Sequence, residues 1–183
     1  MKRAAFKQGM DLWRTPEKVV LVTSIDKNGK PQVITVGWNM RVSFDPPMLA
    51  VAIGNIRYMY ECIKHSEEFV IAVPGIDLAN EVIGCGEPGQ GQENRFEKFG
   101  LKTKIGDYGK SPLIENCIVN FECLMKNEVK TGDHTIFIGK VMGTWVSEEP
   151  TSNLLVVGDE PGYDVLAEAG PYKIGIVKGE NES

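Results

Sequence analysis

The sequence predicts a mainly β protein, built as a closed or nearly closed antiparallel barrel with a few short helices. Three observations predict this class: many short runs of β-branched and apolar residues, glycine- and proline-rich turn signals between them, and few segments with helical spacing. The chain has 183 residues, with 20 glycines and 10 prolines. This length suits one domain. We expect residues 1–183 to form a single domain, with an N-terminal arm at 1–16 and a frayed tail at 179–183.

Composition excludes several classes of protein. Hydrophobic residues make up 42% of the chain and charged residues 25%, as in an ordinary globular protein. The net charge of −5 disfavours non-specific binding to nucleic acid or to an anionic membrane. No apolar run is long enough to span a bilayer, and the basic N-terminus lacks the apolar core of a signal peptide, so we expect a cytoplasmic protein. The four cysteines form no CxxC pair and only two histidines are present, so we expect no metal site.

The first quarter of the chain carries the clearest strand signals. The arm holds three apolar residues that need a surface to pack against, namely Phe6, Met10 and Trp13. Residues 19–25 are typical of a strand, and the Asn-Gly pair within 26–30 predicts a hairpin turn after it. Residues 33–44 alternate apolar and polar side chains throughout, which predicts one long strand, ended by the prolines at 46 and 47.

The polar face of the strand at 33–44 is made mostly of small residues and includes a glycine: Thr35, Gly37, Asn39, Arg41 and Ser43. A glycine within a strand often marks a close approach of a ligand or of another backbone. Two interpretations stay open. The face is either an ordinary solvated surface or a flat polar shelf on which a planar ligand lies.

The remaining elements follow from similar signals. Residues 48–53 form an apolar run typical of a buried strand, and residues 56–65 have helical spacing with Asn55 as a favourable N-cap. A strand at 69–73 and a short helix at 78–83 precede a glycine-rich loop at 84–92, which lacks the Lys-Ser/Thr ending of a phosphate loop. A helical turn is expected at 94–99 and a hairpin turn at 131–133. Further strands are expected at 101–105, 118–129, 134–146, 154–157 and 172–177.

Two side chains stand out as candidates for chemistry. Arg57 lies at the start of the expected helix, where the helix dipole disfavours a cation by about 0.3–1 kcal/mol. A bound anion would reverse that sign, because the free N–H groups and the guanidinium would converge on it. An exposed arginine without a ligand is the alternative. His134 opens a strand directly after a turn, and it is either a surface residue or a residue of a reactive site.

Three segments together resemble the flavin reductase-like family of FMN-binding split barrels, close to its flavoredoxin branch. They are TVGWNMRVSFDPPMLAVAI at 35–53, NIRYMYECIKHSEEFVIAV at 55–73 and GDHTIFIGKV at 132–141. The resemblance implies a six-stranded antiparallel Greek-key split barrel, and a homodimer that holds FMN without a covalent link near the subunit interface. It also implies that NADH or NADPH, where used, binds against the face of the FMN.

The resemblance also implies roles for individual residues. The stretch that would border the flavin ring comprises Thr35, Val36, Gly37, Trp38, Asn39 and Met40, with Ser43 near the ribityl-phosphate. The residues matching the phosphate-binding stretch are Asn55, Arg57 and Tyr58, whereas Met59 replaces the Ser or Thr of many relatives. Arg95 matches a residue near the flavin in some relatives, and His134 matches the histidine of a GDH turn that faces the flavin or the nicotinamide.

The resulting hypothesis is an FMN-dependent oxidoreductase that transfers hydride from NAD(P)H to a flavin, a ferric complex or another small acceptor. Without a nucleophile or metal set in the sequence, redox chemistry must belong to a cofactor. Two alternatives remain. One is a flavoredoxin-like electron carrier reduced by a protein partner, without its own NAD(P)H site. The other is an FMN-free ligand-binding barrel.

Overall fold

The computed structural model describes residues 3–13, 16–89, 91, 93–149, 153–156, 167–169 and 174–176. The chain divides into two compact units. The larger unit comprises residues 18–154, and the smaller comprises 1–17 together with 155–183. The expected frayed tail at 179–183 lies outside the described residues.

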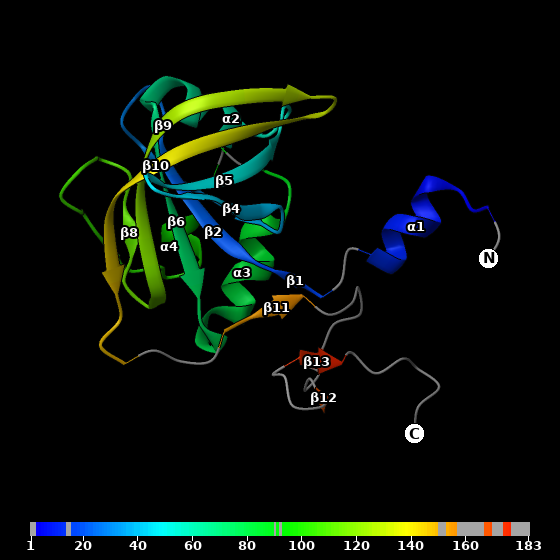
Figure 1. Cartoon of the computed structure of the whole chain (residues 1–183). Coiled ribbons are helices and arrows are strands. Elements are labelled where there is room, and N and C mark those ends of the chain that lie inside the picture. The colour runs from blue at the N-terminus through cyan, green and yellow to red at the C-terminus, as the bar shows by residue number, and fades with distance from the viewer. Residues whose placement is uncertain are drawn as a thin grey trace. The chain divides into compact units, whose positions relative to one another are not determined.

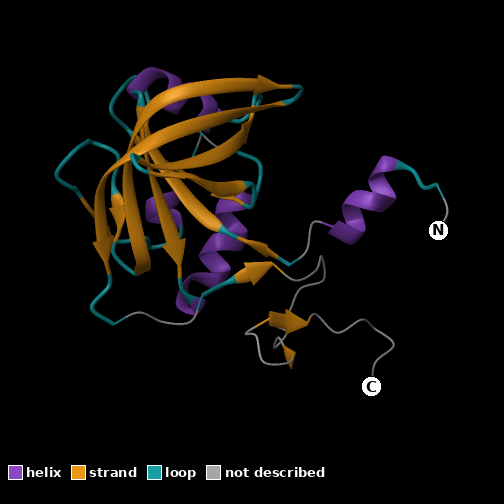
Figure 2. Cartoon of the chain, viewed as in Figure 1, coloured by secondary structure: helices purple, strands orange, loops and turns teal. Residues whose placement is uncertain are grey.

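The larger unit is an antiparallel β-sheet that curls into a split barrel (Figures 1 and 2). Seven strands hydrogen-bond in the order β3-β2-β6-β9-β10-β5-β4, and every neighbouring pair is antiparallel. The link from β5 to β6 crosses over β10 and β9, which gives the Greek-key topology. The strands are β2 (Val20–Ile25), β3 (Pro31–Val36), β4 (Asn39–Phe44), β5 (Pro47–Gly54), β6 (Glu68–Pro74), β9 (Cys117–Thr131) and β10 (His134–Val146). The expected barrel is confirmed, with one strand more than the six expected.

The additional strand arises because the expected long strand at 33–44 is two strands. The chain breaks at Gly37 and Trp38, between β3 and β4, which are the two edge strands of the sheet. Asn39 holds the break: its backbone N–H donates to the Gly37 carbonyl at 2.9 Å, and its amide Nδ2 donates to the same carbonyl at 2.8 Å and to that of Lys18 at 3.0 Å. The short segment at 37–38 thus connects the two edge strands, which closes the sheet towards a barrel.

The apolar face of the stretch at 33–44 is buried in β3 only. Ile34 and Val36 belong to the core, but the apolar residues of the second half are exposed. The exposed fractions are 51% for Trp38, 54% for Met40, 39% for Val42 and 85% for Phe44. The alternating apolar face is therefore not one continuous buried surface: it is buried in β3 and exposed in β4.

The predicted turn after residue 25 is confirmed in detail. Gly29 adopts a left-handed φ of +76°, which favours glycine. The buried Asp26 carboxylate accepts hydrogen bonds from the backbone N–H groups of Asn28 at 2.8 Å and of Lys30 at 2.9 Å. These hydrogen bonds fix the register of β2 against β3.

The barrel core is closed by helix α2 (Tyr58–Ser66), which packs against β2, β3, β5 and β6. Met59, Cys62 and Ile63 are the buried residues of this helix, and Cys62 packs there as a small hydrophobic side chain. They meet side chains from the strands, of which Phe69 and Phe137 are the largest that are fully buried.

The shorter elements deviate more from the expectations. A 3₁₀ turn η1 (Ile76–Leu78) leads into α3 (Ala79–Gly86), which packs on β3 and β2, so the first residues of the expected loop at 84–92 are helical. The turn expected at 94–99 is α4 (Arg95–Lys98). The other elements are α1 (Phe6–Trp13), β1 (Glu17–Lys18), β7 (Thr103–Lys104), β8 (Leu113–Ile114), β11 (Leu155–Val156), β12 (Ala167–Ala169) and β13 (Ile174–Ile176).

Candidate functional site

The candidate site begins where β5 ends and α2 begins. Gly54 is the last residue of β5, and the Arg57 N–H donates to its carbonyl at 2.9 Å, so the chain turns tightly between them. Arg57 is the N-cap of α2, in an extended conformation, and no side chain caps the helix. The expected helix start at 56 and the expected cap by Asn55 are therefore wrong. The first N–H groups of the helix remain without a side-chain acceptor.

Asn55 instead binds the hairpin turn between β9 and β10. Its backbone N–H donates to the Asp133 carbonyl at 2.8 Å and its amide Nδ2 to the Gly132 carbonyl at 3.1 Å. Its amide Oδ1 accepts from the Thr135 hydroxyl at 2.7 Å. The Asn55 amide, which local sequence rules assign to the start of the helix, therefore binds the turn at Gly132 instead.

His134 directly follows this turn and so lies beside Gly54. His134 is the first residue of β10 and lies opposite Gly54 in the register of the sheet. The Asp133 carboxylate Oδ1 lies 2.8 Å from His134 Nδ1, and this hydrogen bond lowers the pKa of the carboxyl. The indole of Trp38 lies against the imidazole, with ring centroids 4.5 Å apart and planes tilted by 36°. The expected position of His134 at the start of a strand is confirmed.

Gly54 leaves open space between the two candidate polar side chains. A methyl group at Gly54 would lie 3.5 Å from Arg57 Cγ and 3.6 Å from His134 Nε2. Within the described part of the chain, the Arg57 guanidinium makes no hydrogen bond or ion pair. Arg57 and His134 therefore flank the side-chain-free backbone of Gly54, and the exposed Trp38 indole lies against His134. Such a set suits a planar ligand that carries an anionic group.

Three other predicted site residues are engaged elsewhere. The Thr35 hydroxyl donates to the Val82 carbonyl in α3. The buried Arg95 guanidinium donates to the carbonyls of Cys85, Glu87 and Pro88, and so holds the end of α3 and the segment after it. The Asn39 amide binds backbone carbonyls at the break between β3 and β4. These contacts leave no continuous polar shelf of the kind that the alternating pattern suggested.

The remaining predicted residues fall into different environments. The Tyr58 hydroxyl donates to Asp26 Oδ2 at 3.1 Å, and burial together with this contact raises the pKa of Tyr58. Met59 is buried in the core. Val36 is also buried, Gly37 is part of the break, Met40 is exposed, and Ser43 lies half-buried beside a register shift in β4.

Sequence reasoning missed two residues of this site, Gly54 and Asp133. Both had a signal: Gly54 ends an apolar run directly before a helix, and Asp133 immediately precedes the candidate histidine. Nothing in the local pattern shows, however, that Gly54 lies opposite His134 or that the Asp133 carbonyl accepts from Asn55.

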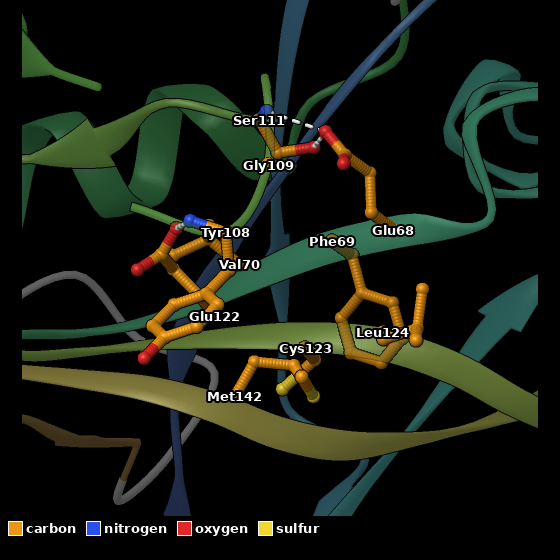
Figure 3. A pocket seen from close by; sticks show the side chains of 10 residues that line it. All are labelled: Glu68, Phe69, Val70, Tyr108, Gly109, Ser111, Glu122, Cys123, Leu124 and Met142. Atoms are coloured by element: carbon orange, nitrogen blue, oxygen red, sulfur yellow. Dashed lines mark hydrogen bonds between the residues drawn. The ribbon is translucent and has the colours of Figure 1, made fainter. Parts of the chain in front are cut away.

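A second hollow lies between β6, β9 and the segment at 107–111 (Figure 3). Its two carboxylates are already occupied. Glu68 accepts hydrogen bonds from the backbone of Lys110 and Ser111, and Glu122 accepts from the backbone of Tyr108 and from Trp145 Nε1. The two carboxylates therefore anchor the segment at 107–111 in this hollow.

Among the described residues, no group of three or more His, Cys, Asp or Glu side chains could hold a metal ion. Among the same residues, no helix is long and apolar enough to cross a bilayer.

The larger unit is thus a small split β-barrel in which Trp38, Arg57 and His134 form a cluster suited to an anionic planar ligand. A model of the flavin reductase like domain matches residues 12–162. The chain belongs to this flavin reductase-like family, and the resemblance seen in the sequence is confirmed.

Curated relatives agree with this assignment. An uncharacterized protein of Archaeoglobus fulgidus is 42% identical over 113 residues, which are 62% of this chain. The match spans 64% of the length of that relative. A flavin reductase of Pseudomonas putida is 29% identical over 156 residues, covering 85% of this chain and 88% of that protein.

Solved structures share the fold. The flavoredoxin of Desulfovibrio vulgaris (Miyazaki F) superposes with a TM-score of 0.70 at 24% identity, covering 81% of this chain and 78% of that one. An NADH:FAD oxidoreductase of Streptomyces globisporus, in complex with NAD and FAD fragments, gives a TM-score of 0.75 at 20% identity. It covers 90% of this chain and 100% of that one. At these identities the likeness is one of fold.

Proposed function

We propose that this protein binds FMN non-covalently and uses it to pass reducing equivalents from NADH or NADPH to a flavin, a ferric complex or another small acceptor. One observation carries the proposal. Arg57 and His134 flank the bare backbone of Gly54, Trp38 lies against His134, and the guanidinium has no partner within the described residues. Membership of the flavin reductase-like family supports a flavin as the planar ligand.

Each residue of the cluster has a distinct role in this proposal. Arg57 and the uncapped N–H groups of α2 hold the phosphate, since both present positive charge at the same end of the helix. The exposed indole of Trp38 borders the ring. His134 presents Nε2 over Gly54, where it can exchange a proton or a hydrogen bond with the reacting groups. The chemistry that a bound flavin supplies is acceptance of hydride at N5.

We also propose that the active form is a homodimer. The exposed apolar residues of β4 and the exposed Phe6 and Trp13 of α1 support it, because a second copy would remove them from water. Light scattering should give twice the monomer mass at micromolar concentration, and Phe44→Asp should shift the protein towards monomer. A monomeric wild-type protein with FMN bound would contradict this proposal.

A direct test of function starts with the colour of the purified protein. Bound flavin absorbs near ~450 nm, so a colourless protein that takes up no added FMN would overturn the proposal in favour of an FMN-free barrel. Stopped-flow mixing of the FMN-loaded protein with NADPH or NADH should bleach this band. His134→Ala should retain FMN but bleach more slowly, and His65→Ala, at the other histidine, should match wild type. Bleaching by a reduced protein donor alone would instead identify an electron carrier.

A further inference from the structure

The turn that carries His134 is fixed more firmly than a hairpin turn requires. Gly132 adopts a left-handed φ of +52°, and the Thr131 hydroxyl donates to the His134 carbonyl at 3.1 Å. Asn55, from the end of β5, then adds three hydrogen bonds to this turn and to Thr135. Thr135 is fully buried, so its hydroxyl depends on the Asn55 amide for a partner.

The polar contacts of the imidazole are equally specific. Nδ1 faces the Asp133 carboxylate at 2.8 Å, while Nε2 points to the space above Gly54 beside Arg57. A carboxylate can only accept a hydrogen bond, so in neutral His134 this contact requires the proton on Nδ1. Nε2 is then the unprotonated nitrogen, and it faces the candidate site. The Trp38 indole lies against the ring and limits its rotation.

We infer that Asn55 and Asp133 are positioning residues for His134: Asn55 ties the Gly132–Asp133 turn to the end of β5, and the Asp133 carboxylate holds the proton of neutral His134 on Nδ1. Asn55 therefore serves the imidazole rather than the phosphate. The catalytic consequence rests on the proposed function of His134, but the state of the imidazole does not, and it can be measured without any flavin.

The test is nitrogen NMR of the two histidines in the ¹⁵N-labelled protein, at about pH 8.5 where histidine side chains are neutral. Wild-type His134 should show a protonated Nδ1 and an unprotonated Nε2. Asp133→Ala should move the proton of His134 partly or fully to Nε2. The signals of His65 should stay unchanged, which makes that residue an internal control. Asp77→Ala, which removes another exposed carboxylate, should leave both histidines as in wild type.

Asn55 is tested by paired variants. Asn55→Ala removes both amide contacts, whereas Asn55→Asp retains an oxygen that accepts from Thr135. Asn55→Ala should broaden or shift the His134 ring signals, and Asn55→Asp should restore them in part. In FMN-loaded protein, Asp133→Ala and Asn55→Ala should slow hydride transfer by up to about a hundredfold while FMN affinity changes little.

The outcomes separate the two hypotheses. A wild-type His134 with its neutral proton on Nε2, or a proton position and ring signals unaffected by Asp133→Ala and Asn55→Ala, would overturn the positioning role whatever happens to flavin binding. If the proton position responds as expected but His134→Ala does not slow hydride transfer, the positioning role stands and the proposed catalytic role of His134 fails.

Discussion

Removing the guanidinium of Arg57 is the sharpest test of where a phosphate binds. Arg57 is half-buried and has no partner among the described residues. It occupies the N-cap position of α2, where no side chain makes a capping hydrogen bond. Losing one charge-assisted hydrogen bond costs about 1.5–3 kcal/mol. That energy corresponds to roughly a ten- to hundredfold rise in the dissociation constant. Arg57→Ala should therefore weaken FMN by about this factor.

The assay compares two flavins by fluorescence titration. Riboflavin lacks the phosphate, so Arg57→Ala should weaken it far less than FMN. Arg41→Ala is the matched control, because it removes a positive charge from exposed strand β4, where its guanidinium lies 6.0 Å above the Phe44 ring. An equal loss of affinity for both flavins would mean that Arg57 acts on the ring or on the fold. No loss for either flavin would place the phosphate elsewhere and refute the assignment of the whole site.

Two further predictions concern stability and reactivity. Glu122→Ala should lower the free energy of unfolding by about 1–3 kcal/mol, because the buried carboxylate accepts from Tyr108 N and Trp145 Nε1. Glu128→Ala is the control: it breaks the exposed ion pair with Lys64 and should lower the stability in urea unfolding much less, because solvent screens such a pair. Equal losses for the two variants would show that Glu122 anchors nothing. Burial raises the pKa of Cys62, Cys117 and Cys123 to about 12 and that of Cys85 to about 11. A thiol reagent at about pH 8 should therefore leave the folded protein unmodified and label all four cysteines only after unfolding; rapid labelling of the folded protein would contradict this.

Local sequence patterns were sufficient to predict most of the strands. The hairpin formed by β2 and β3 follows from alternating side chains and an Asn-Gly turn, and β10 begins at His134 as its sequence indicates. The same kind of pattern failed within residues 33–44. Alternation continues unbroken through Gly37 and Trp38, so nothing local marks the break that makes β3 and β4 the two edges of the sheet.

The candidate site, too, was predicted from the sequence only in part. The sequence identified Trp38, Arg57 and His134, through their residue types and through the family that the three segments resemble. It assigned Asn55 to the helix and Arg95 to the ligand, yet Asn55 binds the turn at Gly132, 77 residues away, and Arg95 binds carbonyls at the end of α3.

The sequence by itself therefore determined most of the strands, the principal turns, the family and the chemical types of the candidate site residues. Only the tertiary structure decided which polar groups are already paired and which face open space. The physical reason is that periodicity and capping depend on neighbours within a few residues. A side-chain hydrogen bond goes to whichever partner the folded chain brings within about 3 Å, and here the decisive partners came from β10 and α3.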